Sequence, residues 1–431
     1  MARKLVFLLL VFGPKVLAQE RILSLPEALS LAAQGPAVQS ASALREAAAA
    51  RVAQAQSALW PMLDLEVQAR TLSKDPGFLV PRGAFANPVP LPLVTGERDV
   101  QSVKLSVSYL LWDWGRTRAL MKAAGKAEDA AAAQEQAKKL ALLLATLKAF
   151  AEAQKAQGVL EAAQQAVDTA RETLRVVSAS VEEQLLPESD RLAAEFFLAR
   201  RQAEMAGAEA QLASALAVLT ELTGVAASKV EPFLPDKLPG VSSPTILPRE
   251  EVKAIQAQKE AARFQAQAFR REWLPVVVLV GGTENLRDHF LLHQTNNFGV
   301  VAVRASLFDG GRARAAAREQ ELVAKAGDFA QEAAERQVKR EVTVAQGEAR
   351  AFQEQLRAAE KAAVAAAEEL RLETLRHEQG LASTRDLLTA QEHVAQAKAA
   401  VAEARAYLLA AIGELVAACG EDLLAYFGGN Q

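Results

Sequence analysis

Residues with active-site chemistry are sparse in this chain of 431 residues. His289 and His293 have the i, i+4 spacing with which two histidines on a helix can bind a metal ion, but the further ligands of a zinc enzyme do not follow. His377 and His393 lie in helix-periodic runs, and Cys419, the single cysteine, is typical of a core residue near a helix end. Because no nucleophile, base or metal cluster converges, the sequence predicts neither an enzyme nor a bound cofactor.

Two acidic residues are distinguished by their position. Asp190 and Asp386 each follow a turn signal, Pro187 in one case and Ser383-Thr384 in the other, and each falls within the first turn of a predicted helix. A carboxylate at this place stabilises a helix by complementing its dipole. A role for these carboxylates in facing a lumen is equally open from the residues alone.

The elements that hold these residues are duplicated, with one offset of 196 residues. Asp190 recurs as Asp386, and Gly224, which ends a predicted helix, recurs as Gly420. The segment DWGRTR at 113–118 recurs as DGGRAR at 309–314. A solenoid repeat has a period of about 20–50 residues, so this longer period indicates a duplicated half-protein. Each half has the order helix, strand, strand, very long helix, shorter helix.

The two halves differ in one loop. From Pro61 to Asp113 is 52 residues, whereas from Pro275 to Asp309 is 34, so the first half carries an 18-residue excess between its strands. The excess falls in a proline-rich segment, about 75–98, that we expect on the outer face together with the second loop.

Composition indicates long packed helices. Ala, Gln, Glu, Arg and Leu occur in uninterrupted runs, which is typical of long helices or coiled coils. The formal net charge is −3, with Lys and Arg interspersed among Asp and Glu, so nothing suggests a nucleic-acid partner. The single cysteine also excludes an internal disulfide framework.

Four helices are predicted, at about 114–181, 312–379, 25–59 and 187–223. The first two would each be roughly 100 Å long at about 1.5 Å per residue, and alanine-rich seams allow close packing. Gly380 can adopt the positive φ that ends a helix, and Ser383 or Thr384 can cap the next one. In the first half, Pro187 can start the helix after the turn.

Alternation with period 2 predicts strands with one row of side chains on each face of a sheet. The four predicted strands are 63–70, 103–109, 276–280 and 301–307. The first two alternate apolar and polar residues, as a barrel wall between lipid and a polar lumen does. The third is apolar throughout, which also fits a buried core strand. Four strands cannot close into a membrane-spanning barrel, because such barrels start near eight strands, so the chain must associate.

All four tryptophans lie beside strand ends that face the helices: Trp60, Trp112, Trp114 and Trp273. Tryptophan favours the membrane–water boundary because its ring is apolar while its N–H seeks water or headgroups. The sequence therefore predicts a membrane-boundary aromatic belt. Packing where the sheet meets the helices is the alternative.

The N-terminus predicts export. Arg3 and Lys4 precede an apolar stretch and the small residue Ala18, the arrangement of a secretory signal peptide. No later stretch reaches 18 apolar residues, so no membrane-spanning helix is predicted. The predicted domains are a signal peptide at 1–18, a first repeat at 19–224, a proline-rich linker at 225–248, a second repeat at 249–420 and a short tail at 421–431.

Short motifs follow one another in a recognisable order. They are LSLPEAL at 23–29, ALWP at 58–61, LWDWGR at 111–116, LFDGGR at 307–312, and QGL followed by DLL within 379–391. Each motif is weak by itself, but their order, duplication and spacing together resemble the TolC-type outer-membrane efflux proteins (outer membrane factors). The resemblance covers nearly all of the chain after the predicted signal peptide.

The resemblance implies an α+β membrane protein. Its long helical hairpins would form a periplasmic α-barrel, and three chains would contribute four strands each to a twelve-stranded barrel in contact with outer-membrane lipid. This homotrimer would be the passive exit duct of a tripartite efflux or type I secretion system, with a periplasmic adaptor (membrane fusion) protein and an inner-membrane pump as partners. The alternative is a periplasmic coiled-coil scaffold without channel activity.

The resemblance also implies roles for particular residues. Asp386 matches the acidic residue that faces the axis at the closed tunnel end, whereas the second acidic position of the family is Thr389 here. The residues that could hold the tip shut are Asp190, Glu188 and Arg385. Adaptor contacts are expected at Gln184, Leu185, Gln379, Gly380 and Leu381. The strand-to-helix junctions are expected at Asp113, Gly115, Arg116, Asp309, Gly310, Gly311 and Arg312.

Overall fold

The computed structural model describes residues 21–86, 88–235 and 248–428. The predicted signal peptide at 1–18 lies outside these residues. The chain divides into two compact units: a helical unit from Met1–Ala41, Glu135–Arg249 and Glu335–Gln431, and a unit containing the main sheet, from Ser42–Gln134 and Glu250–Ala334. Each unit combines segments from both sequence repeats. The predicted domain boundaries therefore describe the order of the repeats along the chain and not the two compact units.

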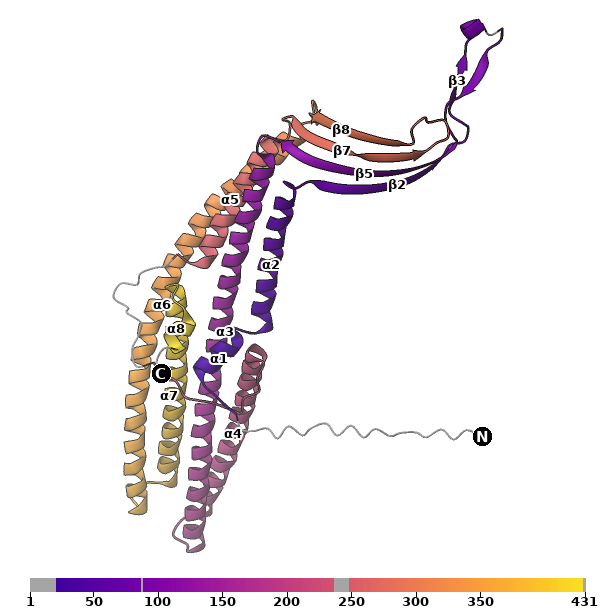
Figure 1. Cartoon of the computed structure of the whole chain (residues 1–431). Helices are drawn as coiled ribbons and strands as arrows, with labels where there is room; N and C mark the ends of the chain where they lie inside the picture. The colour runs from indigo at the N-terminus through magenta and orange to yellow at the C-terminus, as the bar shows by residue number, and fades with distance from the viewer. Residues whose placement is uncertain (1–20, 87, 236–247, 429–431) are drawn as a thin grey trace, which may run out of the picture. The chain divides into compact units, whose positions relative to one another are not determined.

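The two longest helices have the same length and equivalent bounds in the two repeats. Helix α3 spans Arg116–Glu182 and α6 spans Arg312–Glu378, 67 residues each and 196 apart, which confirms the predicted duplication. The other helices, drawn in Figure 1, are α1 Leu25–Ala32, α2 Pro36–Ser57, α4 Glu188–Thr223, α5 Glu250–Arg270, α7 Thr384–Ala418 and α8 Leu423–Gly428.

The first predicted helix is broken in two. A single helix over about 25–59 was expected, but α1 ends at Ala32 and α2 begins at Pro36. The amide of Gly35 donates to the carbonyl oxygen of Ala32 at 3.0 Å, a tight turn that closes the first helix. Proline at the first position then suits the start of α2, because its φ is preset and its missing N–H would have had no partner.

The core of the helical unit lies where α3, α7 and the chain ends meet. Phe150, Leu147, Leu409 and Ile412 are fully buried there. Strand β1 (Ile22–Leu23) pairs in parallel with β6 (Lys229–Val230), which belongs to the predicted linker, and α8 in the predicted tail buries Phe427 in the same core. The described parts of the linker and tail are therefore packed elements.

The main sheet has four antiparallel strands in the order β2-β5-β7-β8, and Figure 1 shows that it is curved. The strands are β2 Met62–Thr71, β5 Asp99–Trp112, β7 Val276–Arg287 and β8 Thr295–Arg304. The predicted fourth strand is wrong in its bounds, because β8 starts six residues before Val301 and ends at Arg304. The third extends beyond the predicted Val280 along the edge strand β8. Among the described residues, no further strand pairs with the outer edge of β2 or β8.

Side chains of the sheet separate by parity. On β5 the odd-numbered residues from Val103 to Tyr109 are exposed and the even-numbered ones between them are half-buried. The registers Leu65↔Leu105 and Glu66↔Lys104 continue this separation onto β2. Over 63–70 of β2 and 103–109 of β5, one face is therefore apolar and the other carries the charges, as predicted. Within the described ranges, no helix is both long enough and apolar enough to cross a membrane.

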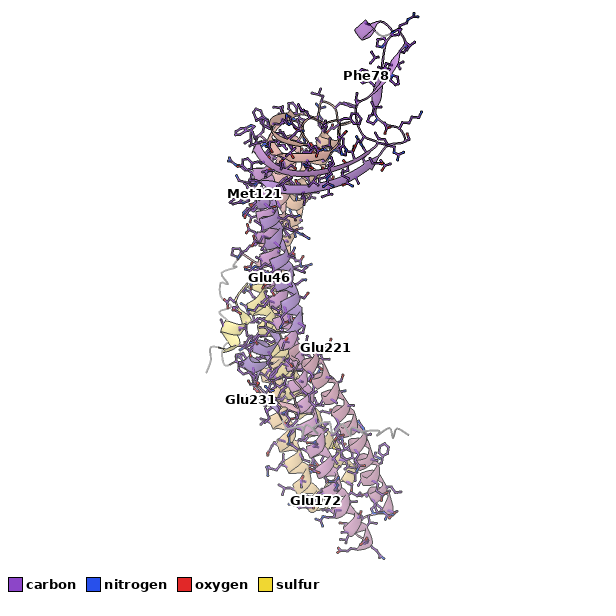
Figure 2. The ribbon with its side chains drawn as sticks, turned by 45° about the vertical axis from the view of Figure 1, so that its right-hand side comes forward. Glu46, Phe78, Met121, Glu172, Glu221 and Glu231 are labelled. Atoms are coloured by element: carbon purple, nitrogen blue, oxygen red, sulfur yellow. The ribbon has the colours of Figure 1, made fainter. Side chains whose placement is uncertain are left out.

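The 18-residue excess of the first repeat is a separate β-hairpin. Strands β3 (Gly77–Val80) and β4 (Leu91–Val94) pair antiparallel, with a short 3₁₀ turn at Ala84–Ala86 between them. Phe78 on this hairpin is exposed (Figure 2).

Candidate functional sites at the hairpin tips and the strand-to-helix junctions

Both helical hairpins of the helical unit turn in the same way. Gln184 has φ 58° and its equivalent Gly380 has φ 71°. After the first long helix, the amide of Leu185 donates to Ser180 O at 2.8 Å; after the second, the amide of Leu381 donates to Arg376 O at 2.7 Å. A helix that ends in one left-handed residue, with a hydrogen bond from the next amide to the carbonyl five residues earlier, has a Schellman motif. The first repeat makes it without glycine, at the cost of placing a glutamine in the left-handed region.

The residues predicted to contact an adaptor lie in these two turns. Leu185 is 71% exposed and Leu381 is 66% exposed, and they occupy equivalent positions. Leucine at this position of a Schellman motif usually packs back on its own helix. Here each tip instead presents an apolar side chain to its surroundings.

Asp386 caps its own helix. Its carboxylate accepts hydrogen bonds from the Ser383 hydroxyl at 2.7 Å and the Ser383 amide at 3.1 Å, while the Asp386 amide donates to the Ser383 oxygen at 3.2 Å. This is a capping box. The hydrogen bonds from Ser383, with the charges of Arg376 and Arg385, lower the pKa of Asp386 below its ordinary 3.8, so its exposed carboxylate is ionised at neutral pH.

Asp190 occupies the equivalent position but bonds across to the other hairpin. Pro187, the predicted first residue of this helix, instead occupies the N-cap position of α4. It has no side-chain acceptor and no backbone N–H. A capping box is therefore impossible here. Instead the Asp190 carboxylate accepts a hydrogen bond from the Thr384 hydroxyl at 2.7 Å. Thr384 is buried, and nothing in the local sequence pattern predicts this contact.

The other two residues predicted to close the tip do not join this bond within one chain. Glu188 pairs with Arg191 in its own helix. The backbone carbonyl of Arg385 accepts from the Thr389 hydroxyl at 2.9 Å, again within one helix. No salt bridge among the described residues links Arg385 to Asp190 or to Glu188.

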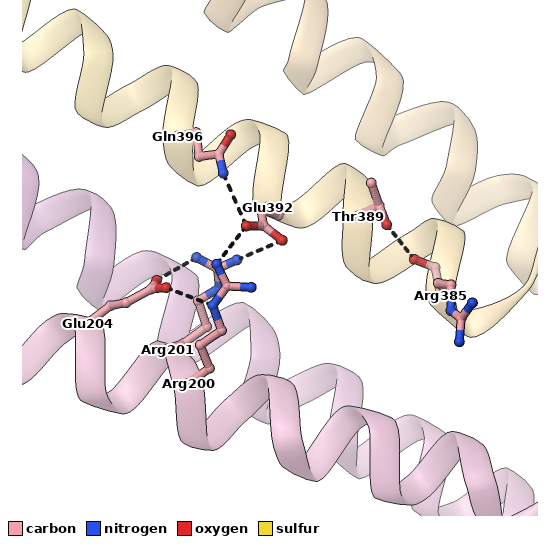
Figure 3. Close-up of polar contacts among 7 residues, drawn as sticks. All are labelled: Arg200, Arg201, Glu204, Arg385, Thr389, Glu392 and Gln396. Atoms are coloured by element: carbon pink, nitrogen blue, oxygen red, sulfur yellow. Dashed lines mark hydrogen bonds and ion pairs between the residues drawn. The ribbon is translucent and has the colours of Figure 1, made fainter.

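A charge cluster joins α4 to α7 farther along the hairpins (Figure 3). Glu392 accepts from Arg200 at 3.0 Å and lies 3.5 Å from the guanidinium of Arg201. The Arg201 side chain is only 5% exposed, contacts Glu204 at 2.6 Å, and lies 4.6 Å from the ring centroid of Phe197. A buried guanidinium needs counter-charges, so Glu392 and Glu204 hold this contact together. Sequence reasoning missed the cluster.

In the sheet unit, both strand-to-helix junctions share one construction. The Asp113 carboxylate accepts from the amides of Gly115 at 3.0 Å and Thr117 at 2.6 Å. The Asp309 carboxylate accepts from Gly311 and Ala313, each at 2.9 Å. The amides of Ala313 and then Gly311 lower the pKa of Asp309. Each aspartate thus caps the long helix that follows it.

The junction backbone adopts left-handed conformations at equivalent positions. Trp114 (φ 57°) matches Gly310 (φ 67°), and Gly115 (φ 78°) matches Gly311 (φ 83°). Two consecutive residues with positive φ turn the chain sharply out of the strand and into the helix. Glycine adopts this region without strain, whereas Trp114 does so at a cost.

Glu272 links the two junctions. Its Oε1 lies 3.4 Å from a guanidinium nitrogen of Arg116 and 2.5 Å from one of Arg312, which are equivalent residues of the two repeats. Next to it, Arg271 donates to the Gly115 carbonyl at 2.9 Å. The predicted junction arginines therefore share one carboxylate. The sequence did not predict this contact, because Glu272 lies just after α5 and outside the duplicated junction motifs.

The four tryptophans are exposed beside β2, β5 and β7, at the ends expected from the sequence. The Trp114 indole N–H donates to Pro275 O at 2.9 Å, and its ring packs edge-on against Trp112 with centroids 6.0 Å apart. Junction packing thus accounts for part of this cluster, while the faces of Trp60 and Trp273 stay open.

The histidine pair lies in a loop rather than on a helix. His289 and His293 fall between β7 and β8, so their i, i+4 spacing does not bring them to one helical face. His289 contacts the Glu97 carboxylate. No group of three or more possible metal ligands occurs among the described residues.

Comparisons with known proteins agree on one family. The model of the outer membrane efflux protein family matches residues 29–225 and 243–421, which is most of the chain. No curated protein matches the chain.

Three solved structures share the fold. The outer membrane protein VceC of Vibrio cholerae is 22% identical over 92% of this chain and 96% of that one, with a TM-score of 0.76. The CmeC outer membrane channel of Campylobacter jejuni is 17% identical over 92% and 85%, with a TM-score of 0.78. The open-state MtrE outer membrane channel of Neisseria gonorrhoeae is 21% identical over 92% and 89%, with a TM-score of 0.75.

The resemblance predicted from the sequence motifs is thus confirmed, and the scaffold alternative is not favoured. With its long helical hairpins, duplicated junctions and two-faced sheet, the chain belongs to the outer membrane efflux protein family, whose members are channels, and it is an outer-membrane exit duct with a large periplasmic helical portion.

Proposed function

We propose that three copies of this chain form the duct, each contributing its four strands to a twelve-stranded barrel. The observation that carries this is the sheet itself, in which β2 and β8 both have a free edge. Free edges within a membrane leave backbone groups without hydrogen-bond partners, so a spanning sheet must close on itself or on other chains. Four strands are too few to close alone.

The barrel would place the apolar, odd-numbered face of the sheet against outer-membrane lipid. The exposed row on β5, from Val103 to Tyr109, supplies the outward contacts. Trp60 and Trp273 would lie at the membrane boundary, where an indole ring is favoured. The helices would continue as a hollow duct through the periplasm.

The hairpin tips would form the gate. A threefold ring of Asp386 carboxylates attracts cations and repels anions at a constriction. The capping box keeps the carboxylate ionised while it faces the axis, so one residue serves both roles. The Thr384–Asp190 bond would hold the two hairpins of each chain together in the closed state. Glu188 and Arg385, which lack contacts to it within a chain, would act between neighbouring chains.

The tips would also receive the periplasmic adaptor, which connects the duct to an inner-membrane pump that supplies the energy. Leu185 and Leu381 are the exposed apolar contacts for this partner, flanked by Gln184, Gln379 and Gly380. Burial of these leucines against a partner would favour association, because removing apolar surface from water drives most protein–protein association. The duct itself conducts passively.

The test is the native mass of the chain after detergent extraction from the outer-membrane fraction, followed by single-channel recording. A detergent-bound particle with three chains that conducts ions supports the proposal. A water-soluble monomer or dimer from the periplasm contradicts it.

A further inference from the structure

The polar face of the sheet carries its carboxylates in two neighbouring cross-strand rows, and Arg70 of β2 and Arg304 of β8 lie on the same face nearer the strand ends. The register places Glu66 opposite Lys104, and Lys104 opposite Glu284. In the adjacent row Asp64 lies opposite Ser106, and the row ends at Phe298 on β8. Every charged side chain in these two rows points to the same face, because all have the same parity.

The opposite face has no charges at this level. Its residues are the odd-numbered ones in 63–67, 103–109, 277–285 and 297–303, and all are apolar, small or uncharged polar. The charges are therefore confined to the face that the proposed barrel turns inward.

The carboxylates of the two rows are not neutralised by neighbours. Directly opposed residues on paired strands are about 5 Å apart, close enough for ion pairs. Lys104 nevertheless directs its ammonium group to the ring of Phe298, 5.5 Å from the centroid. No salt bridge among the described residues involves Glu66, Glu284 or Asp64. Three carboxylates against one ammonium group leave an excess of two negative charges per chain.

The Asp64 row contains a position that has no side chain. Gly282 lies in the Asp64 row, and a Cβ there would come within 2.2 Å of the Leu105 carbonyl oxygen and 2.9 Å of the Ser106 Cα. Only glycine fits, so no side chain covers the space between Ser106 and Phe298. Of the carboxylates beside it, Asp64 and Glu66 are exposed and Glu284 is half-buried.

We propose that Asp64, Glu66, Lys104 and Glu284 form a cation-selecting belt inside the barrel, separate from the gate at the tips. The proposal rests on the trimeric barrel of the proposed function. Three copies of the belt bring together nine carboxylates and three ammonium groups on one ring of the wall. Rings of carboxylates favour cations over anions in a channel, and low-dielectric walls strengthen their field. The belt favours permeants with net positive charge over anionic ones.

Screening sets the conditions under which the belt acts. The Debye length is about 30 Å at 0.01 M salt, about 10 Å at 0.1 M and about 3 Å at 1 M. In a wide lumen the belt therefore acts on the whole cross-section only at low salt. Its effect on selectivity should fade as the salt concentration rises.

The experiment is the reversal potential of purified trimers in planar bilayers under a potassium chloride gradient. All variants are made in an Asp386→Asn background, so that the tip carboxylate does not contribute. The triple variant Asp64→Asn, Glu66→Gln, Glu284→Gln should lower the potassium-to-chloride permeability ratio at least about threefold at 0.01–0.1 M salt. Lys104→Gln removes the one positive charge and should shift the ratio in the opposite direction. At 1 M salt all variants should converge.

The outcomes separate the belt from the proposed function. If the parental protein forms no trimer or passes no current, the proposed function fails. If trimers conduct but neither the triple variant nor Lys104→Gln changes the permeability ratio at low salt, the belt is wrong and the duct stands. Should the triple variant fail to assemble, Lys104→Gln and Lys104→Glu decide the matter, because both retain all three carboxylates.

Discussion

Thr384 of the second repeat donates a hydrogen bond to Asp190 of the first, with 2.7 Å between the hydroxyl and carboxylate oxygens. Asp190 can accept this bond because Pro187, at the N-cap position, cannot form a capping box with it. The equivalent residue Asp386 does form a capping box, with Ser383. The duplicated tips have thus become specialised. One aspartate stabilises its own helix, and the other joins the two hairpins.

Loss of this bond should loosen the tip. A hydrogen bond to an ionised group contributes about 1.5–3 kcal/mol, so Thr384→Val should shift the closed-to-open equilibrium about 10- to 150-fold toward opening. The measurement is open probability in single-channel recordings. Thr343→Val is the matched control, because the Thr343 hydroxyl donates to the Lys339 carbonyl of its own helix, away from the tip. Equal open probabilities for the two variants would remove the Asp190 bond from the gate.

Charge and capping at Asp386 can be separated by two substitutions. Asp386→Asn keeps an oxygen acceptor for Ser383 but removes the charge, and should relieve block by divalent cations. Ser383→Ala breaks the cap, keeps the charge and should leave the block in place while lowering thermal stability. If the block survives Asp386→Asn, the carboxylate does not line the constriction.

The same residue predicts a pH dependence. Because the pKa of Asp386 is lowered in the folded protein, the ionised form is favoured, and its contribution is present above the ordinary pKa of 3.8. Capping and cation block should both persist from neutral pH to about pH 4 and be lost only as the pH falls through the lowered pKa, below 3.8. Block measured across this range, with Asp386→Asn as the pH-independent reference, checks the sign.

Substitutions at different residues of the charge cluster in Figure 3 should lower the stability of the protein by different amounts. Glu392→Gln leaves the buried Arg201 with only Glu204 as counter-charge and should lower stability by about 1–3 kcal/mol. Arg201→Met removes the buried charge, while Arg200 still pairs with Glu204 at 3.1 Å and with Glu392 at 3.0 Å, so this variant should be nearly neutral. Arg200→Met, at a largely exposed pair, should cost less than about 1 kcal/mol. Thermal unfolding followed by helical circular dichroism gives the ranking, and a cost for Arg201→Met as large as that for Glu392→Gln would contradict it.

Two glycines within α3 should behave oppositely when replaced by alanine. A Cβ at Gly158 would lie 2.6 Å from the Ala402 Cβ on α7, so Gly158→Ala should separate the helices and cost about 1–3 kcal/mol. Gly125 has no neighbour within 4 Å of such a Cβ, and Gly125→Ala should stabilise the helix by up to about 1 kcal/mol. Melting temperatures that move in the same direction would contradict the close approach.

Local signals predicted much of this fold. The 196-residue offset predicted matching helices because the junction motif recurs before each long helix and Asp190 recurs as Asp386 after it, and the strand alternation predicted the two faces of the sheet. The break at Gly35-Pro36 was also readable as a turn signal. The end of β8 was not, because the alternation continues past Arg304 after the partner strand has ended. The Thr384–Asp190 bond and the Arg201–Glu392 pair depend on how separate helices pack, so no spacing in the sequence encodes them.

The carboxylate of Glu272 has a consequence for the history of this chain. When the two repeats are aligned at Pro61 and Pro275, the counterpart of Glu272 is Ala58, so a single acidic residue now serves an arginine from each half. The halves have thereby lost their independence. A gene rebuilt from two copies of the first half would leave both arginines without their counter-ion, whereas one rebuilt from two copies of the second half would have an acid to spare. A chain built from two identical halves would therefore not reproduce the shared pairing of Glu272 with Arg116 and Arg312.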